Sequence, residues 1–376
     1  MKKRSRILIV LVLVGLITFA LLWVSNHHSR LPVSTTQPIR FGISPFQDTL
    51  LPILGTDKYK KYYSDLGLKV DFDILGWQEV LEALSGGQID VAIYNDSGVI
   101  AVHHQNPEII YYYGVNTFDN GFALLIRPDG KLKSLAEIEA TTPDHATAVR
   151  LTAAQLKGKT VVTTGSTDME QGVAAAARKG GLRFSKDSDT DVKIIDLPPD
   201  EGLAAFLAGS GDAYIGGIPQ RTRATKEGMI EMLTGVDLGP APINGLVTTR
   251  KFATDHPQEL LKLLNAWFKI VNYVNANEDD AAKIIVAELN QRSAANFTVD
   301  DFKRFWQNYE HYPLSPVEAE RDIISPSGRD YWKNRWDDDN AYYYNTIHSI
   351  PKPVAPEEAF FMETVQAEYV RSYGSQ

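Results

Sequence analysis

The 376-residue sequence contains no cysteine. Its absence excludes disulfides, thiolate metal sites, cysteine nucleophiles and the lipid-modified cysteine of bacterial lipoproteins. This composition suits an exported protein that folds without oxidation. The motifs Gly-x-Ser-x-Gly and His-Glu-x-x-His are also missing, and neither His27–His28 nor His103–His104 has metal-ligand spacing. The sequence therefore gives no indication of a serine hydrolase or a zinc hydrolase.

Basic residues are scarce outside the N-terminal segment. The chain has 38 basic and 47 acidic residues, and five of the basic residues lie in 1–30, where there is no acidic one. Beyond residue 30, the remaining 33 basic residues face 47 acidic ones, a net charge of −14. Nucleic-acid surfaces need clustered positive charge, so we expect no nucleic-acid partner.

Residues 1–30 combine a basic leader with a long apolar run. The run, residues 7–24, is 18 residues long and is interrupted only by one Gly and one Thr. Such a run can just span a bilayer, and the positive leader keeps the N-terminus inside. No small-x-small cleavage site follows, so an uncleaved signal anchor is favoured over a cleaved signal peptide. Residues 31–38 are predicted to be a linker, which places the globular part in the periplasm or on the extracytoplasmic face of the cytoplasmic membrane.

Two similar strand-and-turn segments organise the globular part. In Leu84–Ser97, a helix end and a Gly-Gly turn precede a short apolar strand, and Asn95, Asp96 and Ser97 follow that strand. The segment Phe206–Pro219 repeats the order of helix end, small-residue turn, acidic residue, apolar strand and tip. The repetition predicts two related α/β lobes, with a cleft for a small molecule between the strand tips.

The chain is predicted to leave the first lobe and later return to it. Short apolar strands alternating with amphipathic helices place residues 39–127 in the first part of lobe one and residues 128–242 in lobe two. Residues 243–376 form the second part of lobe one, ending in aromatic-rich helices that we expect to pack on that lobe. The polar segment Lys131–Thr152 is an insertion without evident chemistry.

Several of these motifs resemble one known family. They are a first strand with a polar tip, the strand Gly67–Ile74, the helix pattern Trp77-x-x-x-x-x-Ala-Leu84, the run Gly86-Gly-Gln-Ile-Asp-Val-Ala92, Leu156-Lys-Gly-Lys159, Gly211-Asp-Ala with Pro219, and Phe252-Ala-x-x-x-Pro257. Over Ile39 to Leu289 the sequence resembles the substrate-binding proteins of ABC importers, in the group for nitrate, sulfonates, taurine and thiamine pyrimidines. The resemblance implies the α/β periplasmic-binding-protein type II fold. Two mixed, mostly parallel sheets are then joined by two hinge crossings, and one lobe rotates to close on the ligand.

The resemblance also implies ligand contacts at the strand tips. The matching positions are Gln47, Asp48, Trp77, Asn95, Asp96, Ser97, Asn116, Thr117, Ser166, Thr167, Asp168, Gly216 and Gly217. We expect Trp77 to provide an apolar wall or a cation-binding face, and the neutral polar groups to supply hydrogen bonds. These positions include three carboxylates and no basic residue. A neutral or amine-bearing heterocycle, such as a pyrimidine, therefore fits at least as well as nitrate or a sulfonate. N-capping of helices is the alternative role for each aspartate.

The function implied by the resemblance is that of the extracytoplasmic solute-binding component of an ABC importer. Such a protein captures a small solute and delivers it to a permease in the inner membrane, without catalysis, metal or cofactor. The expected partners are the small-molecule ligand, the ABC permease and the membrane through the N-terminal segment. One alternative is an enzyme similar to the thiamine-pyrimidine synthase of the same fold group, which disagrees with the export segment and the lack of cysteine. The other is a membrane-tethered ligand-sensing domain, which would share the pocket.

Overall fold

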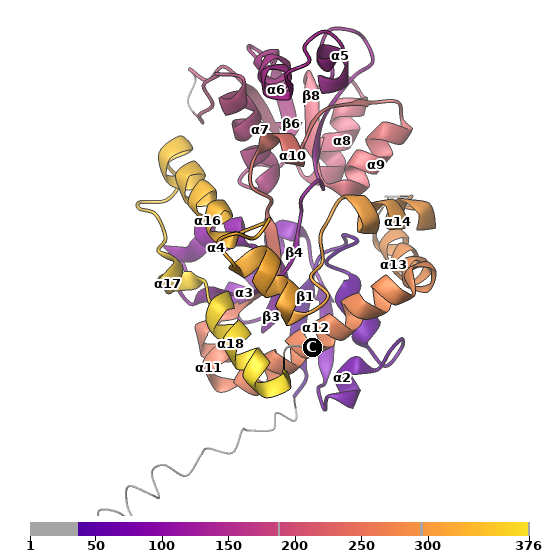
Figure 1. The fold of residues 1–376 in the computed structure, drawn as a ribbon, viewed down its shortest axis with the longest axis vertical. Helices are drawn as coiled ribbons and strands as arrows, with labels where there is room; N and C mark the ends of the chain where they lie inside the picture. The colour runs from indigo at the N-terminus through magenta and orange to yellow at the C-terminus, as the bar shows by residue number, and fades with distance from the viewer. Residues whose placement is uncertain (1–36, 187–188, 294–295, 375–376) are drawn as a thin grey trace, which may run out of the picture. The chain divides into compact units, whose positions relative to one another are not determined.

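Two five-stranded sheets form the centre of the computed structural model, which describes residues 37–186, 189–293 and 296–374 (Figure 1). The first sheet has the order β2-β1-β3-β10-β4, with strands Val70–Ile74, Ile39–Ile43, Val91–Asn95, Ile243–Thr249 and Ile109–Thr117. The second sheet has the order β7-β6-β8-β5-β9, with strands Lys193–Asp196, Thr160–Thr163, Ala213–Gly216, Ala123–Ile126 and Ile230–Thr234.

The two sheets follow the same plan. In each, the fourth strand is antiparallel to both neighbours: β10 to β3 and β4, and β5 to β8 and β9. The chain crosses to the second sheet between β4 and β5 and returns between β9 and β10. The mixed, mostly parallel sheets with two crossings that the resemblance implied are therefore present. The expected lobe boundary after residue 127 falls one strand beyond the first crossing, because β5 already belongs to the second sheet.

Burial on both faces explains the composition of the central strands. All residues of β3 and β4 are buried, which matches their near-continuous apolar sequences. Glycine is needed where another side chain comes close to the backbone. A Cβ at Gly245 of β10 would lie 2.4 Å from the Tyr111 ring, whose hydroxyl donates a 3.0 Å hydrogen bond to the carbonyl of Ile243. This approach fixes how β10 packs against β4.

Most helices belong to the first sheet. The apolar face predicted for the long helix after Pro257 is confirmed, since its Leu, Trp, Phe, Ile and Val residues are buried. The C-terminal segment packs on β4 as expected, and Phe360 stacks on Tyr111 with ring centroids 5.2 Å apart. The helical elements are η1 Leu51–Gly55, α2 Tyr62–Asp65, α3 Trp77–Ser85, α4 Asp96–His103, α11 Arg250–Asp255, α12 Pro257–Ala276, α13 Glu278–Arg292, α14 Val299–Asn308, α15 Pro316–Ala319, η2 Glu320–Ile324, α16 Trp332–Ala341, η3 Tyr342–Thr346, α17 Pro356–Ala359 and α18 Met362–Tyr373.

The remaining helices cover the second sheet (Figure 1). They are α5 Leu135–Glu139, α6 His145–Ala154, α7 Asp168–Lys179, α8 Pro199–Leu207, α9 Ile218–Lys226 and α10 Gly235–Leu238. The polar segment Lys131–Thr152 contains α5 and most of α6, and these helices pack on α7 and β9. The segment is thus part of the helical cover of this sheet.

No helix among the described residues is long and apolar enough to cross a bilayer. The predicted signal segment, residues 1–30 with the apolar run 7–24, lies outside those residues. So does the linker up to residue 36.

Candidate functional site

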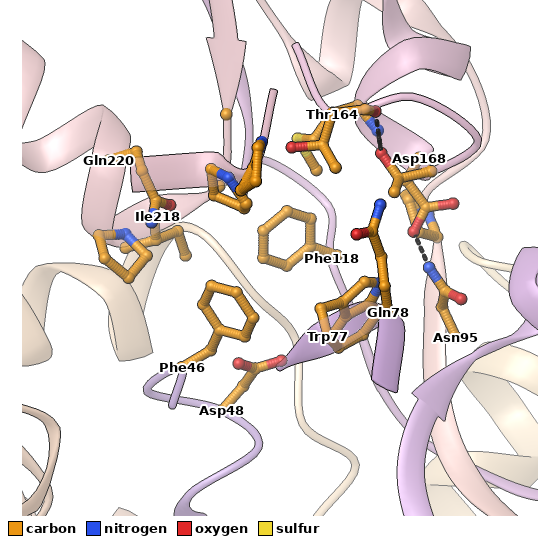
Figure 2. Close-up of a pocket in the computed structure, with 18 of the residues that line it drawn as sticks. Phe46, Asp48, Trp77, Gln78, Asn95, Phe118, Thr164, Asp168, Ile218 and Gln220 are labelled. Atoms are coloured by element: carbon orange, nitrogen blue, oxygen red, sulfur yellow. Dashed lines mark hydrogen bonds between the residues drawn. The ribbon is translucent and has the colours of Figure 1, made fainter. Parts of the chain in front are cut away.

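A cavity of ≈ 330 Å³ lies where strand ends from both sheets meet (Figure 2). The first sheet contributes the segments after β1, β2 and β4 and the last residue of β3, and the second sheet contributes the segments after β6, β7 and β8. This edge of an α/β sheet is the usual place for a ligand, because strand ends and helix N-termini converge there. The lining residues are Phe46, Gln47, Asp48, Gly76, Trp77, Gln78, Glu79, Asn95, Phe118, Thr164, Thr167, Asp168, Met169, Pro198, Pro199, Tyr214, Gly216, Gly217, Ile218, Pro219, Gln220, Pro242 and Asn244.

The structure brings eight of the predicted ligand positions together at this cavity. They are Gln47, Asp48, Trp77, Asn95, Thr167, Asp168, Gly216 and Gly217. The other five do not line it: Asp96, Ser97, Asn116, Thr117 and Ser166. Ligand contact itself remains a prediction for all of them.

Aromatic rings form much of the cavity wall. Phe46 and Trp77 meet edge to face with ring centroids 5.8 Å apart, and Trp77 stacks on Tyr94 at 4.2 Å. Phe118 and Tyr214 also line the cavity, and Figure 2 shows the rings of Phe46, Trp77 and Phe118 around the same space. Trp77 is only half-buried, so part of its ring is free to contact a ligand. Such faces suit a flat ligand or a cation.

Asp48 brings a buried carboxylate to the cavity. The residue is 5% exposed, and its Oδ2 accepts a 2.8 Å hydrogen bond from Nδ2 of Asn244. Burial raises the pKa of Asp48 to about 6, although hydrogen bonds from the Thr49 amide and from Asn244 oppose the rise. The preceding residue, Gln47, is 1% exposed, and its Oε1 has no hydrogen-bond partner among the described residues. An unpartnered buried acceptor is costly unless a donor reaches it.

A second buried carboxyl group lies close to Asp48. Glu310 accepts 2.6 Å hydrogen bonds from Nδ2 of Asn116 and from the hydroxyl of Tyr312. Burial, and then the charge of Asp48, raises the pKa of Glu310 well above its usual range. The amide of Asn116 therefore serves Glu310 and is not among the groups that line the cavity.

Asp168 is fully engaged by protein groups. Its Oδ2 accepts from Nδ2 of Asn95, and its Oδ1 accepts from the Ser97 hydroxyl at 2.5 Å and pairs with Nη2 of Arg335 at 2.9 Å. Oδ1 of Asn95 accepts a 3.0 Å hydrogen bond from the Gly98 amide as the N-cap of α4. These bonds join the tip of β3 to the start of α7, the helix that packs on the second sheet. Asn95, Ser97 and Asp168 thus tie the two sheets together.

Asp96 is buried away from the cavity. It is 1% exposed, and its Oδ1 accepts from the Ser97 amide at 3.0 Å and from the Ile243 amide at 3.4 Å. Burial raises the pKa of Asp96 to about 7, while the charge of Arg335 opposes the rise. Asp96 and other carboxylates do not form a metal site, since no group of three or more side chains that could hold a metal ion occurs in the described part of the chain.

The polar groups predicted at the start of α7 are mostly used locally. Thr167 lines the cavity, but its hydroxyl caps the helix by accepting from the Met169 amide at 3.2 Å. Ser166 is exposed, with a φ of 58°, and its amide donates to Glu170. In lobe one, the hydroxyl of Thr117 donates to Asp330 at 3.0 Å. The Ser166 amide and the Thr117 hydroxyl are thus bonded to other protein groups, and neither residue lines the cavity.

Much of the lining was not among the residues predicted from the sequence. Phe46 and Gln78 are neighbours of predicted residues, and Pro198–Pro199 follow β7 after one residue, so a search just beyond the end of every predicted strand would have found them. Asn244 escapes that search because β10 is antiparallel, and its beginning reaches the cavity instead of its end. Arg335 carries no local signal, since 167 residues separate it from Asp168.

Solved structures of the same fold are found among periplasmic binding proteins. The periplasmic aliphatic sulphonate binding protein SsuA of Escherichia coli is 17% identical, with a TM-score of 0.64, over 86% of this chain and 92% of that one. The nitrate-binding protein NrtA of Synechocystis PCC 6803 is 13% identical, with a TM-score of 0.58, over 89% of each chain. The Candida albicans CA3427 product, which has the generic periplasmic binding protein fold, is 12% identical, with a TM-score of 0.61, over 89% and 95%. No curated protein sequence matches significantly.

The fold and the sequence together place the chain in a class. The two sheets with two crossings and a cavity between them define a two-lobed periplasmic-binding-protein fold. The model of the NMT1-like family matches residues 36–289, and the chain therefore belongs to the NMT1-like family. The group of proteins that the sequence resembled is thereby confirmed.

Proposed function

We propose that this chain is the extracytoplasmic solute-binding component of an ABC importer. It captures a small organic or nitrogen- or sulfur-containing solute, such as a sulfonate, nitrate or a pyrimidine, and delivers it to a permease in the inner membrane. The observation that carries the proposal is the cavity between the strand tips of two sheets, in a chain that belongs to the NMT1-like family. The similar structures from E. coli and Synechocystis are named as sulphonate- and nitrate-binding proteins, which supports the same role here.

The two crossings between the sheets give this protein a way to open and close. We assign residues 39–117 and 243–376 to lobe one and residues 123–238 to lobe two, with the crossings between β4 and β5 and between β9 and β10 as hinges. A solute that touches the strand tips of both lobes binds the closed arrangement more tightly than the open one. Ligand binding therefore stabilises the closed form, which is the form we expect the permease to recognise.

The cavity favours binding over catalysis. Among the described residues that line it there is no Ser, Cys, Lys or His side chain, so nucleophiles of these types and a histidine base are not present. The predicted residues that line the cavity are accordingly assigned no catalytic role. The signal anchor proposed for residues 7–24 would keep the protein at the extracytoplasmic face, next to its permease.

A thermal-shift screen tests the proposal. The full chain, purified in a mild detergent, is mixed with nitrate, alkanesulfonates, taurine, pyrimidines and amines, and the unfolding midpoint is measured for each. A solute at about 100 times its Kd stabilises the folded state by about 2.7 kcal/mol, which raises the midpoint by several degrees. Mass spectrometry of each mixture then looks for products. Turnover of a solute would replace the binding-protein assignment with an enzyme, and a panel without any shift would contradict the assignment itself.

A further inference from the structure

The cavity offers acceptors to a ligand and very few donors. This point concerns the same site as the proposed function and rests on it. Among the described residues that line the cavity there is no Lys, Arg or His, but there are three carboxylates. Two of these are already used: Asp168 is paired with Arg335, and Glu79 accepts a 2.9 Å hydrogen bond from the amide of Gly76 at the start of its own helix. The carboxylate left for a ligand is that of Asp48.

Asp48 has no counter-charge within the part of the chain that the structure describes. Neither Asp48 nor the nearby Glu310 forms an ion pair with any described residue, and both are buried. Among the described residues, the one side-chain donor to Asp48 is the neutral amide of Asn244. The Asp48 carboxylate is thus buried without a cation beside it, so a positive charge delivered by a ligand would be attracted and an anion repelled.

We propose that the solute taken by this cavity is a flat organic cation that carries N–H groups, with Asp48 as its counter-charge. Its N–H groups donate to the carboxylate of Asp48. The rings of Trp77 and Phe118 cover its faces by stacking and by cation–π attraction. Oxyanions are excluded, because the lining has no basic side chain to neutralise them and places a buried carboxylate beside them. This selectivity differs from the sulphonate and nitrate that the names of the compared proteins state.

Three probes with the same phenyl ring and different head charges test this inference. Benzamidine is a flat cation with N–H groups, benzyl alcohol is neutral, and benzenesulfonate is an anion. Each is titrated into the full chain in mild detergent, and binding is followed by calorimetry and tryptophan fluorescence. Benzamidine is expected to bind more than about tenfold more tightly than benzyl alcohol, and benzenesulfonate more weakly than both.

Two variants then locate the charge preference. Asp48→Asn keeps the size of the side chain and one acceptor oxygen. It should lower the affinity for benzamidine by about tenfold or more and change the affinity for benzyl alcohol by no more than about twofold. Glu82→Gln is the matched control: Glu82 is exposed about one turn further along α3 and does not line the cavity, so the benzamidine preference should persist without its carboxylate. The unfolding midpoint of each variant shows that it is folded.

The outcomes separate this inference from the proposed function. Tighter binding of benzenesulfonate than of benzamidine, or of a sulfonate or nitrate in the thermal-shift panel than of any cation, overturns the inference and leaves the solute-binding function standing. Unchanged benzamidine affinity in Asp48→Asn also overturns it. Failure of all three probes to bind at millimolar concentration overturns it as well, and the solute-binding function is then decided by the panel alone.

Discussion

Arg335 of α16 forms a buried ion pair with Asp168 of α7, with 2.9 Å between Nη2 and Oδ1. Both side chains are less than 10% exposed, and Nη2 also pairs with Asp339 and donates to Oε1 of Gln171, each at 2.8 Å. Asp168 in turn accepts from Asn95 at the tip of β3. The network therefore joins the C-terminal segment, the second sheet's helix α7 and the first sheet. It forms a non-covalent link between the lobes in addition to the two chain crossings.

Removing Arg335 should destabilise the protein strongly. Arg335→Met leaves Asp168 and Asp339 as buried carboxylates without their partner, and breaking a buried pair in this way costs about 3–5 kcal/mol. The free energy of unfolding from urea titration of the full chain measures the loss. A loss below about 1 kcal/mol would mean that the network does not hold the lobes together.

Arg178→Met is the matched control for that variant. Arg178 also connects α7 to α16, through Asp338 at 3.2 Å, but its side chain is 56% exposed. Exposed pairs contribute about 0–1 kcal/mol because water screens them and the side chains lose entropy. The two arginine substitutions at one helix–helix contact should thus differ by several-fold in their effect on stability.

Trp77→Ala should weaken ligand binding more than it weakens the fold. The ring of Trp77 is half-buried at the cavity and stacks on Tyr94, so its loss removes an aromatic face from the ligand. Affinity for benzamidine, or for a solute from the panel, is expected to fall by about tenfold to hundredfold. Trp306→Ala is the control, because Trp306 is equally half-buried and stacks on Tyr312 but does not line this cavity. Equal losses of affinity in both variants would move the ligand site elsewhere.

The parts of the fold that depend on local patterns were predictable from sequence. The turn before β3 and its apolar run identify a strand, and the repeated pattern at Phe206–Pro219 identifies the second lobe. The expectation that ligand-site residues lie at the tips of the strands therefore found Asp48, Trp77 and Gly216 at the cavity. It failed at Asn116 and Thr117 because β4 extends through Thr117, so the first residue beyond the strand is Phe118, which does line the cavity.

Contacts between distant segments were not predictable. Glu310 is 194 residues from Asn116 in sequence, and Arg335 is 167 residues from Asp168, and no periodicity connects either pair. The role of a predicted residue in such a pair can be assigned only when its distant partner is known. Asn116 bonds a buried acid, and Asp168, which does line the cavity, also pairs with Arg335 of the C-terminal segment.

Asn95→Asp should destabilise the protein even though it keeps the helix cap. Asn95 accepts from the Gly98 amide through Oδ1, a role that an aspartate performs equally well. Its Nδ2, however, donates to Asp168, and a carboxylate there would face another carboxylate in a buried place. We expect a loss of about 2–4 kcal/mol, measured by urea titration at pH 7. Asn95→Ser keeps a capping oxygen without adding a second charge, so its free energy of unfolding should fall by less. A larger fall in Asn95→Ser than in Asn95→Asp would contradict this account.

Asp48 should make the protein less stable as pH rises. Burial raises its pKa to about 6 in the folded state, above the ordinary value of 3.8, so between these pH values the folded protein binds more protons than the unfolded chain. Stability must then fall with increasing pH through this window, by up to about 3 kcal/mol. Asp48→Asn removes the titrating group. Its free energy of unfolding, measured by urea titration, should therefore rise by about 2–3 kcal/mol relative to that of the natural sequence between pH 4 and pH 7.

Asp301 provides a comparison of opposite sign for the same titration series. Burial acts to raise its pKa, but hydrogen bonds from Lys226 and Thr298 lower the pKa below the ordinary value. The folded state thus favours this carboxylate, and the stability it contributes is lost as pH falls. The free energy of unfolding of Asp301→Asn should fall furthest below that of the natural sequence at neutral pH and least in acid. Asp48→Asn should show the opposite trend, becoming more stable than the natural sequence as pH rises. Parallel pH profiles for the two variants would show that the burial of Asp48, and with it the unpaired carboxylate offered to a ligand, is not as described.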